Sequence, residues 1–190
     1  MKKSFKELPP ADFLLYEKVT SFVTQYYTES RNINDHQKYV IEQKILYIIQ
    51  AISLRYYKMP LFRDDFIAYR EGPVIEKINK IQDKKNTIVK KPKNIIEEDL
   101  SYYQFIADQL LQIVIDGFTQ ELLPMNYKIL SELTHTGEWE KKYNQRDQET
   151  DLKRKNTLGK MVDKELLNFY TSLEHKYPDF TNFAKESLGV

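Results

Sequence analysis

Residues 35–57 read DHQKYVIEQKILYIIQAISLRYY, and this stretch decides the fold class. One stripe of apolar side chains recurs at helical spacing, and further apolar side chains cover the other directions: Ile41, Ile45, Ile48 and Ile52 form the stripe, and Leu46, Tyr47, Ile49 and Leu54 lie around it. A helix that is apolar nearly all round is normally the one at the centre of a core. We therefore predict a central helix over residues 35–57, ended before Pro60.

The rest of the chain also favours helices, because only five glycines and seven prolines interrupt its 190 residues. Apolar residues at helical spacing predict further helices at about 12–29, 94–117, 124–135 and 161–175. The segment 141–155 is almost wholly polar and predicts a solvated loop.

A short stretch between the helices has the alternation of a strand. Residues 66–70 alternate in side-chain character, and the apolar centre of the lysine-rich segment 83–93 is a candidate second strand. Gly72 and Pro73 follow the first stretch and predict the start of a helix, since proline is favoured at the first helical position.

A chain of this length forms one substantial domain and needs no disulfide or metal to hold its core. We predict a mainly α fold: a single compact helical domain around a central apolar helix, with at most a small two-stranded β-hairpin. The domain is expected to span 12–176, after a flexible N-terminal tail at 1–11 and before a C-terminal tail or short helix at 177–190.

Composition excludes several kinds of site. The chain has no cysteine, which removes thiol catalysis and cysteine-based metal centres, and five scattered glycines cannot build a phosphate-binding loop. The longest uncharged apolar run, residues 45–54, is about half of a membrane-spanning length, and the N-terminus lacks a secretory signal. We expect a cytoplasmic protein that has no membrane partner, no cofactor, no metal and no catalytic residue.

The sequence LSELTHTGEW, at 130–139, is the strongest candidate for chemistry. Glu132 and His135 are three residues apart and would share a helix face, where they could bind a metal or move a proton. The other histidines do not lie at a metal-ligand spacing from His135. A structural lock is favoured, in which a threonine caps the turn and Trp139 packs on the core.

Two features point to partners. Lysine clusters at 84–93 and 141–155 could contact phosphates, but acidic residues lie among or beside both clusters and the net charge is only +1, so DNA is the less favoured partner. Tyrosine pairs at 26–27, 56–57 and 102–103 cannot each bury both rings on one helix face, and tyrosine is enriched at protein interfaces.

Three stretches resemble the Panacea domain family, which includes the Soc-type antitoxin and GepA-type phage-associated proteins. They are QKILYIIQAISLRYYKMPLF (43–62), FIAYREGPV (66–74) and LSELTHTGEW (130–139), in the order seen in that family. The matching positions are Lys44, Tyr47, Gln50, Pro60, Leu61, Phe62, Ala68, Tyr69, Gly72, Pro73, Val74, Leu133, Thr134, His135 and Trp139. The departures are Ile45 in place of leucine, Tyr69 where tryptophan is common, and Glu138 in place of proline.

The resemblance implies an antitoxin that neutralises a cognate toxin protein by direct contact. It also implies a protease as a further candidate partner, because the Soc-type member delivers its toxin to one. The matched residues are expected to be structural or partner-binding, and a nucleic-acid-binding regulator of a phage or toxin–antitoxin operon remains the alternative function.

Overall fold

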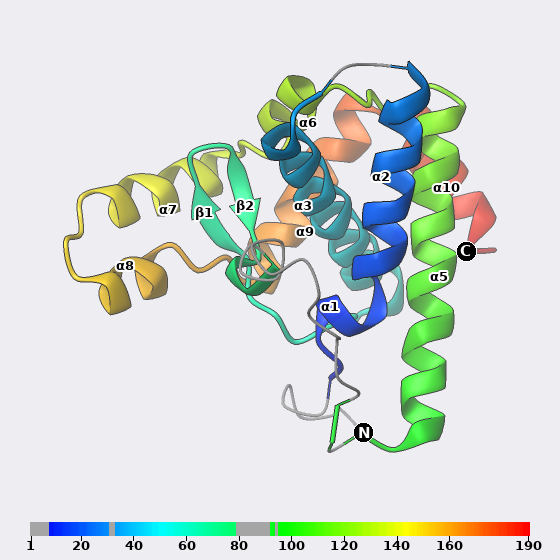
Figure 1. Cartoon of the computed structure of the whole chain (residues 1–190), viewed down its shortest axis with the longest axis horizontal. Coiled ribbons are helices and arrows are strands. Elements are labelled where there is room, and N and C mark those ends of the chain that lie inside the picture. Colours follow the sequence, from blue (N-terminus) through cyan, green and yellow to red (C-terminus); the bar gives the residue numbers. More distant parts are fainter. Residues whose placement is uncertain (1–7, 31–32, 79–91, 94) are drawn as a thin grey trace.

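The computed structural model describes residues 8–30, 33–78, 92–93 and 95–190 (Figure 1). Within these ranges the chain is mainly α-helical, with one two-stranded antiparallel sheet, as predicted. The elements in chain order are α1 (Ala11–Leu14), α2 (Tyr16–Ser30), α3 (Asp35–Ile52), the π-helical turn η2 (Ser53–Tyr57), β1 (Ile67–Tyr69), β2 (Gly72–Val74), α5 (Glu97–Thr119), α6 (Tyr127–Leu133), α7 (Gly137–Asp147), α8 (Leu152–Leu158), α9 (Asp163–Lys176) and α10 (Pro178–Ser187).

The predicted central helix is confirmed. α3 contacts α2, α5, α6, α9 and β2, and every residue from Val40 to Ile52 is buried. A capping box starts the helix: the Asn34 side chain accepts a hydrogen bond from the Gln37 backbone, and the Gln37 side chain accepts one from the Asn34 backbone. η2 continues it to Tyr57, so the helical segment covers the predicted range.

Aromatic rings fill the space between α3 and its neighbours. The Tyr47 ring lies edge-on to Phe66 at 4.9 Å between centroids and meets Phe169 of α9 at 4.8 Å. Phe180 of α10 is fully buried, and α10 packs on both α5 and α9. Ordered contacts therefore extend to the C-terminal helix.

The sheet differs from the one predicted. β1 pairs with β2, with Ala68 opposite Pro73 and Tyr69 opposite Gly72, so Pro73 lies in a strand and the predicted helix start there is wrong. Proline is tolerated because β2 is an edge strand, where a missing N–H leaves no gap in a ladder. The predicted second strand at 83–93 falls largely outside the described residues.

The predicted loop at 141–155 is also wrong. The chain forms α7 and α8 there, and Figure 1 shows these two helices extending to one side of the central bundle, beyond the sheet. α7 contacts both α8 and β1, and it buries only Trp139 and Arg146. Two buried side chains do not make a continuous apolar face, so hydrophobic periodicity did not predict this helix.

Two helix ends were assigned wrongly from sequence. α5 continues past Gly117 to Thr119, and a Cβ at Gly117 would lie 2.6 Å from the Phe180 ring, so this glycine permits close packing with α10. The predicted helix start at residue 12 lies inside α1, which begins at Ala11, and the Asp12 carboxylate pairs with Lys77 at 2.9 Å. Residue 94, the predicted start of this α5 helix, lies outside the described residues.

Candidate functional site

The three sequence stretches that matched the motif meet at one place in the fold. Gly72, at the end of the β1–β2 turn, has a φ of +99°, and its backbone lies against both the central helix and the α6–α7 corner, which is formed by residues 134–136. A Cβ built at Gly72 would be 2.4 Å from Thr134 Oγ1 and 2.6 Å from Lys44 Nζ. Central helix, hairpin and corner therefore join around the tip of Lys44.

Lys44 is the most unusual charged group at this junction. The side chain is fully buried, and Nζ donates a hydrogen bond to the Pro73 carbonyl at 3.2 Å. Burial lowers the pKa of Lys44 to about 7, and the nearby Glu71 carboxylate acts weakly in the opposite direction. A neutral amine of this kind could serve as a base or nucleophile, but no part of it reaches solvent, so a substrate has no approach.

Replacement of Lys44 by methionine should remove a pH dependence of stability. The unfolded lysine holds its proton up to about 10.5 while the folded one releases it near 7, so the unfolded state binds more protons between these values. The free energy of unfolding of the wild type should then rise by about 1 kcal/mol between pH 6 and pH 8 relative to Lys44→Met. Urea unfolding at both pH values measures this, and identical pH profiles for the two proteins would contradict it.

Hydrogen bonds fix the α6–α7 corner to the hairpin turn. Ser131 Oγ donates to the Glu71 carbonyl at 2.8 Å, and Thr134 Oγ1 donates to the Ser131 carbonyl at the same distance. Thr136 caps α7, because its side chain accepts a hydrogen bond from the Trp139 backbone N–H at 3.3 Å. The corner is thus held by side chains on both of its helices.

Three rings stack beside this corner. The His135 and Trp139 rings lie 3.8 Å apart and nearly parallel, and Tyr143 continues the stack at 5.3 Å from Trp139. Trp139 Nε1 donates to the Tyr69 carbonyl at 3.1 Å, and the Arg146 guanidinium covers the Tyr69 ring at 3.7 Å. α7 is therefore attached to β1 through one hydrogen bond and one cation–π contact.

His135 is not arranged for acid–base chemistry at neutral pH. Partial burial and the charge of Lys44 lower its pKa to about 4, so the imidazole is neutral at physiological pH. Nε2 lies 3.4 Å from Ser131 Oγ. Glu132 is exposed, and among the described residues no group of three or more carboxylates and histidines is placed to hold a metal ion.

Gln50 holds the end of the first motif stretch, at residues 61–62. Its Oε1 accepts from the Leu61 N–H at 2.9 Å and its Nε2 donates to the Phe62 carbonyl at 3.3 Å, so one side chain satisfies the backbone that follows Pro60. Gln43, about two turns earlier, accepts from the Ile75 N–H at 2.8 Å. Sequence reasoning did not select Gln43, although a glutamine inside an otherwise apolar helix is the signal that could have found it.

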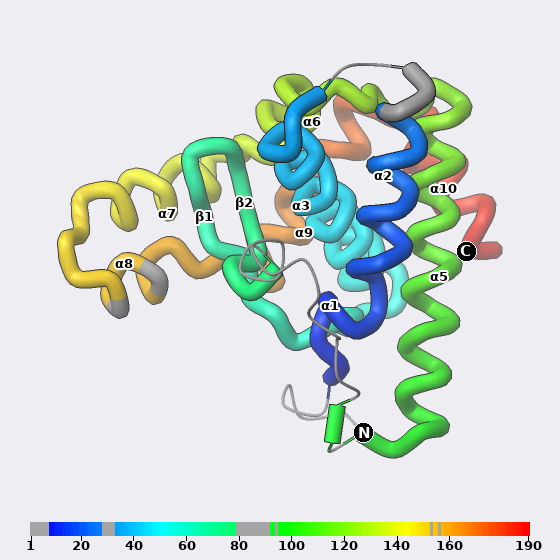
Figure 2. Tube along the Cα trace, viewed as in Figure 1, coloured from blue at the N-terminus to red at the C-terminus, as the bar shows by residue number. Residues whose placement is uncertain are grey.

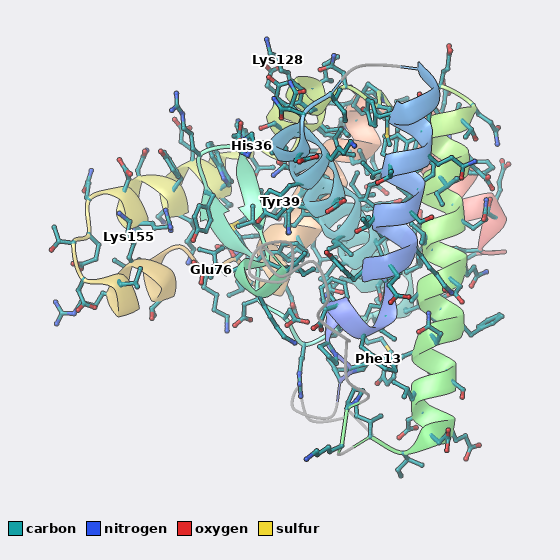
Figure 3. All side chains as sticks on the ribbon, in the orientation of Figure 1. Phe13, His36, Tyr39, Glu76, Lys128 and Lys155 are labelled. Atoms are coloured by element: carbon teal, nitrogen blue, oxygen red, sulfur yellow. The ribbon has the colours of Figure 1, made fainter. Side chains whose placement is uncertain are left out.

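The hairpin also has a side that is partly exposed to solvent. Figure 3 shows His36, Tyr39 and Glu76 near β2. His36 pairs with Glu71 at 2.6 Å, and the Tyr69 hydroxyl donates to Glu76. These contacts hold the turn at the surface, and Glu71 is a second residue that sequence reasoning missed.

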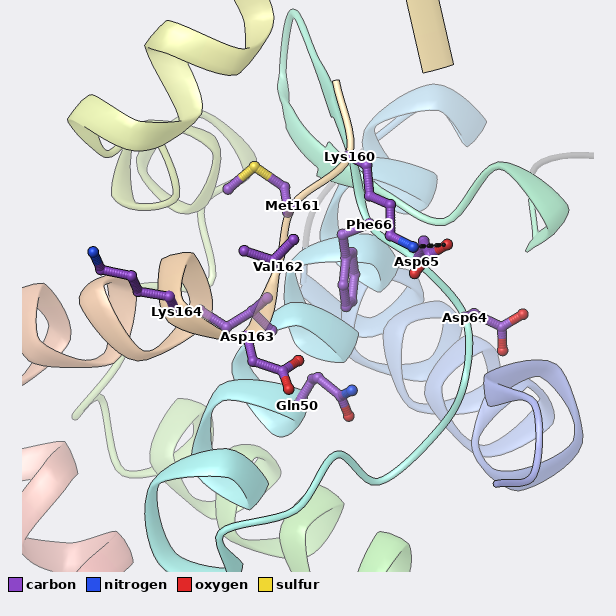
Figure 4. A pocket seen from close by; sticks show the side chains of 10 residues that line it. Gln50, Asp64, Asp65, Phe66, Lys160, Met161, Val162, Asp163 and Lys164 are labelled. Carbon is purple, nitrogen blue, oxygen red and sulfur yellow. Dashed lines mark ion pairs between the residues drawn. The ribbon is translucent and has the colours of Figure 1, made fainter. Parts of the chain in front are cut away.

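A cavity of about 370 Å³ lies between α3, the segment just before β1 and the segment that leads into α9 (Figure 4). Gln50 and Phe66 line it, with charged side chains of both signs around them: Asp64, Asp65, Asp163, Lys160 and Lys164. Lys160 pairs with Asp65 at 2.8 Å, and burial raises the pKa of both Asp64 and Asp163. Such a mixture of charges selects neither a cationic nor an anionic ligand.

The stretches that meet at this junction lie within a match to a known protein family. The family model described as "Antitoxin SocA-like, Panacea domain" matches residues 43–140, which is more than half of the chain. The chain belongs to this family. No curated protein and no solved structure matches the chain.

The Panacea match contains the whole junction around Lys44. It begins at Gln43 in α3 and ends at Glu140, one residue after the stacked Trp139. The Panacea family is an antitoxin family, so a toxin is the class of partner that membership indicates. None of the described helices is both long enough and apolar enough to cross a membrane.

Proposed function

We propose that this Panacea-domain protein neutralises a cognate toxin by direct protein–protein contact. The observation that carries the proposal is the family match over residues 43–140, which covers the central helix, the hairpin and the α6–α7 corner. Neutralisation by contact needs a stable surface and no reacting group, which suits a junction whose unusual lysine is sealed from solvent.

The matched residues act in this proposal as the framework that holds the surface. Lys44, Gln50 and Trp139 each bond to backbone of a different chain segment, and all three side chains are buried. Buried polar groups with well-placed partners specify one arrangement of the chain. The surface that meets the toxin must then be sought among exposed residues.

Expression of this chain together with the product of the adjacent open reading frame tests the function. We expect that product to arrest growth alone, the present chain to restore growth, and the two proteins to purify as one complex. An empty vector is the control for rescue. Failure of the purified proteins to bind, together with failure to restore growth, would contradict the proposal.

Delivery to a protease is a separate, finer proposal within the same function. It requires that the toxin's half-life shorten when this chain is present, whereas simple inhibition leaves the half-life unchanged or longer. A pulse-chase measurement of the toxin with and without the chain distinguishes the two modes.

The alternative is a nucleic-acid-binding regulator. Basic residues of α7, α8 and the segment after them support it, but acidic residues alternate with them: the basic ones are Lys141, Lys142, Arg154, Lys155 and Lys160, and the acidic ones are Glu138, Glu140, Asp147, Glu149 and Asp151. A DNA affinity that does not change with salt, or no binding at moderate salt, would remove this alternative.

A further inference from the structure

α5 is the longest described helix and is only partly covered. Figures 1 and 2 show it along one edge of the bundle, with its N-terminal end extending past α1. α10 covers its C-terminal part, where the backbone at Gly117 lies against Phe180. The N-terminal half contacts α1, and Phe13 of α1 lies at this side of the molecule (Figure 3).

One face of α5 is exposed or half-exposed and carries aromatic rings at its centre. We define the α5 outer face by six residues that recur at spacings of four and three: Glu98, Tyr102, Phe105, Gln109, Gln112 and Asp116. Phe105 is 67% exposed and Tyr102 is 51% exposed, whereas the adjacent Tyr103 is buried in the core. The two tyrosines of this pair therefore point to different environments, as the sequence predicted.

Packing of the core does not require these two exposed rings. Scattered exposed apolar residues are ordinary on protein surfaces, but two aromatic rings on adjacent turns of one helix form a contiguous patch. Tyr57 adds to its edge, because its hydroxyl donates to Gln109 Oε1 at 2.8 Å and holds that side chain in place. The spacing is that of a seam along which a helix packs on a partner.

The charged residues that α5 itself carries are all acidic. Between Lys93 and Lys128 the sequence holds six acidic residues and neither lysine nor arginine: Glu97, Glu98, Asp99, Asp108, Asp116 and Glu121. The first three favour the helix N-terminus by offsetting its dipole, and Lys18 pairs with Asp108. Asp116 accepts a hydrogen bond from the neutral Gln112 Nε2 at 2.8 Å, and Glu98 is exposed, so a carboxylate lies at each end of the face.

We propose that the α5 outer face is the surface that docks the toxin, and that it takes a basic protein surface with an apolar centre. The inference rests on the antitoxin function proposed above. Tyr102 and Phe105 supply the apolar anchors, and Glu98 and Asp116 lie at the two ends of the patch to meet basic side chains. A second copy of this chain would bring like charges together, and nucleic acid would be repelled.

Binding of the purified product of the adjacent open reading frame tests the face. The double variant Tyr102→Ala/Phe105→Ala should bind about 30-fold or more weakly, the loss typical of central aromatic anchors, and should fail to restore growth. The matched control is Ile129→Ala/Leu152→Ala, which removes exposed apolar side chains from α6 and α8 and should bind as the wild type does. All of these side chains are exposed, so melting temperatures should stay unchanged.

A second experiment tests the two carboxylates of the α5 outer face. Glu98→Gln/Asp116→Asn should weaken binding by about 3–10-fold at low salt, and the difference from the wild type should shrink as salt is added. Glu140→Gln/Asp147→Asn, which removes two exposed carboxylates from α7, is the matched control and should leave affinity unchanged. A greater effect of the α7 control than of the α5 variant would overturn the proposal.

The results of these binding and growth experiments distinguish failure of the docking proposal from failure of the proposed antitoxin function. Wild-type chain that neither binds nor rescues overturns the antitoxin function, and the docking proposal with it. Wild-type chain that rescues while the aromatic double variant binds and rescues equally well overturns the docking proposal alone. A wild-type dimer that the double variant abolishes would assign the face to a second copy and would also overturn it.

Discussion

Replacement of Trp139 by alanine should lower the free energy of unfolding by about 3–5 kcal/mol. The ring is 8% exposed, lies between the rings of His135 and Tyr143, and donates from Nε1 to the Tyr69 carbonyl. Its loss would leave a cavity between α7 and β1 and an unpaired carbonyl on the strand. Urea unfolding followed by circular dichroism measures the change.

Trp139→Phe separates the two contributions. Phenylalanine keeps an aromatic ring in the stack but cannot donate to Tyr69, so we expect a smaller loss of about 1–3 kcal/mol. Tyr127→Ala, at a half-buried ring of α6 away from the stack, is a control that should cost less than Trp139→Ala. A melting point unmoved by Trp139→Ala would show that α7 is not attached through this ring, and would make the ring a candidate for partner contact instead.

The central helix could be predicted because its signal is local and dense. A helical stretch that is apolar on nearly all sides is typical of the middle of a core, and the structure buries every position from 40 to 52. Even so, the same stretch contains polar residues that hydrophobic periodicity does not use. Gln43, Lys44 and Gln50 are buried because each bonds to backbone of a distant segment, and no local pattern encodes those partners.

The hairpin and the α7–α8 pair show where sequence reasoning fails. Pro73 has the ordinary features of a helix start, but tertiary contacts decide otherwise: its carbonyl accepts from Lys44, and Ala68 lies opposite it in the sheet. α7 is mostly polar because Trp139 and Arg146 are the only residues of this helix that are buried. Both errors come from contacts between segments that lie far apart in the chain.

The candidate site was only partly accessible from the sequence. Similarity to a family selected residues in three separate stretches, yet it did not say that the Gly72 backbone lies against Lys44 and Thr134. The exposed half of the tyrosine pair at 102–103 was expected from helix geometry alone, because adjacent residues point about 100° apart. The acidic residues near Tyr102 can be read from the sequence, but only the structure shows that this face of α5 is exposed.

Replacement of Gly72 by alanine should be among the most destabilising single changes in the protein. The φ of +99° strains any residue with a Cβ by about 1–2 kcal/mol, and crowding against Thr134 and Lys44 adds about 1–3 kcal/mol. We expect the free energy of unfolding to fall by about 2–5 kcal/mol in total, measured by urea unfolding. Neither neighbour can withdraw easily, because Thr134 and Lys44 are themselves buried and hydrogen-bonded to backbone.

Gly137→Ala is the matched control for this change. Gly137 begins α7, and a Cβ there meets nothing within 4 Å, so alanine should be neutral or stabilise by about 0.5–1 kcal/mol. Gly189 has a positive φ of 69° but open space around it, so Gly189→Ala carries the backbone strain without the clash. If Gly72→Ala costs no more than Gly189→Ala, the close contact of hairpin, central helix and corner is wrong; a clearly larger cost supports that junction as the framework of the fold.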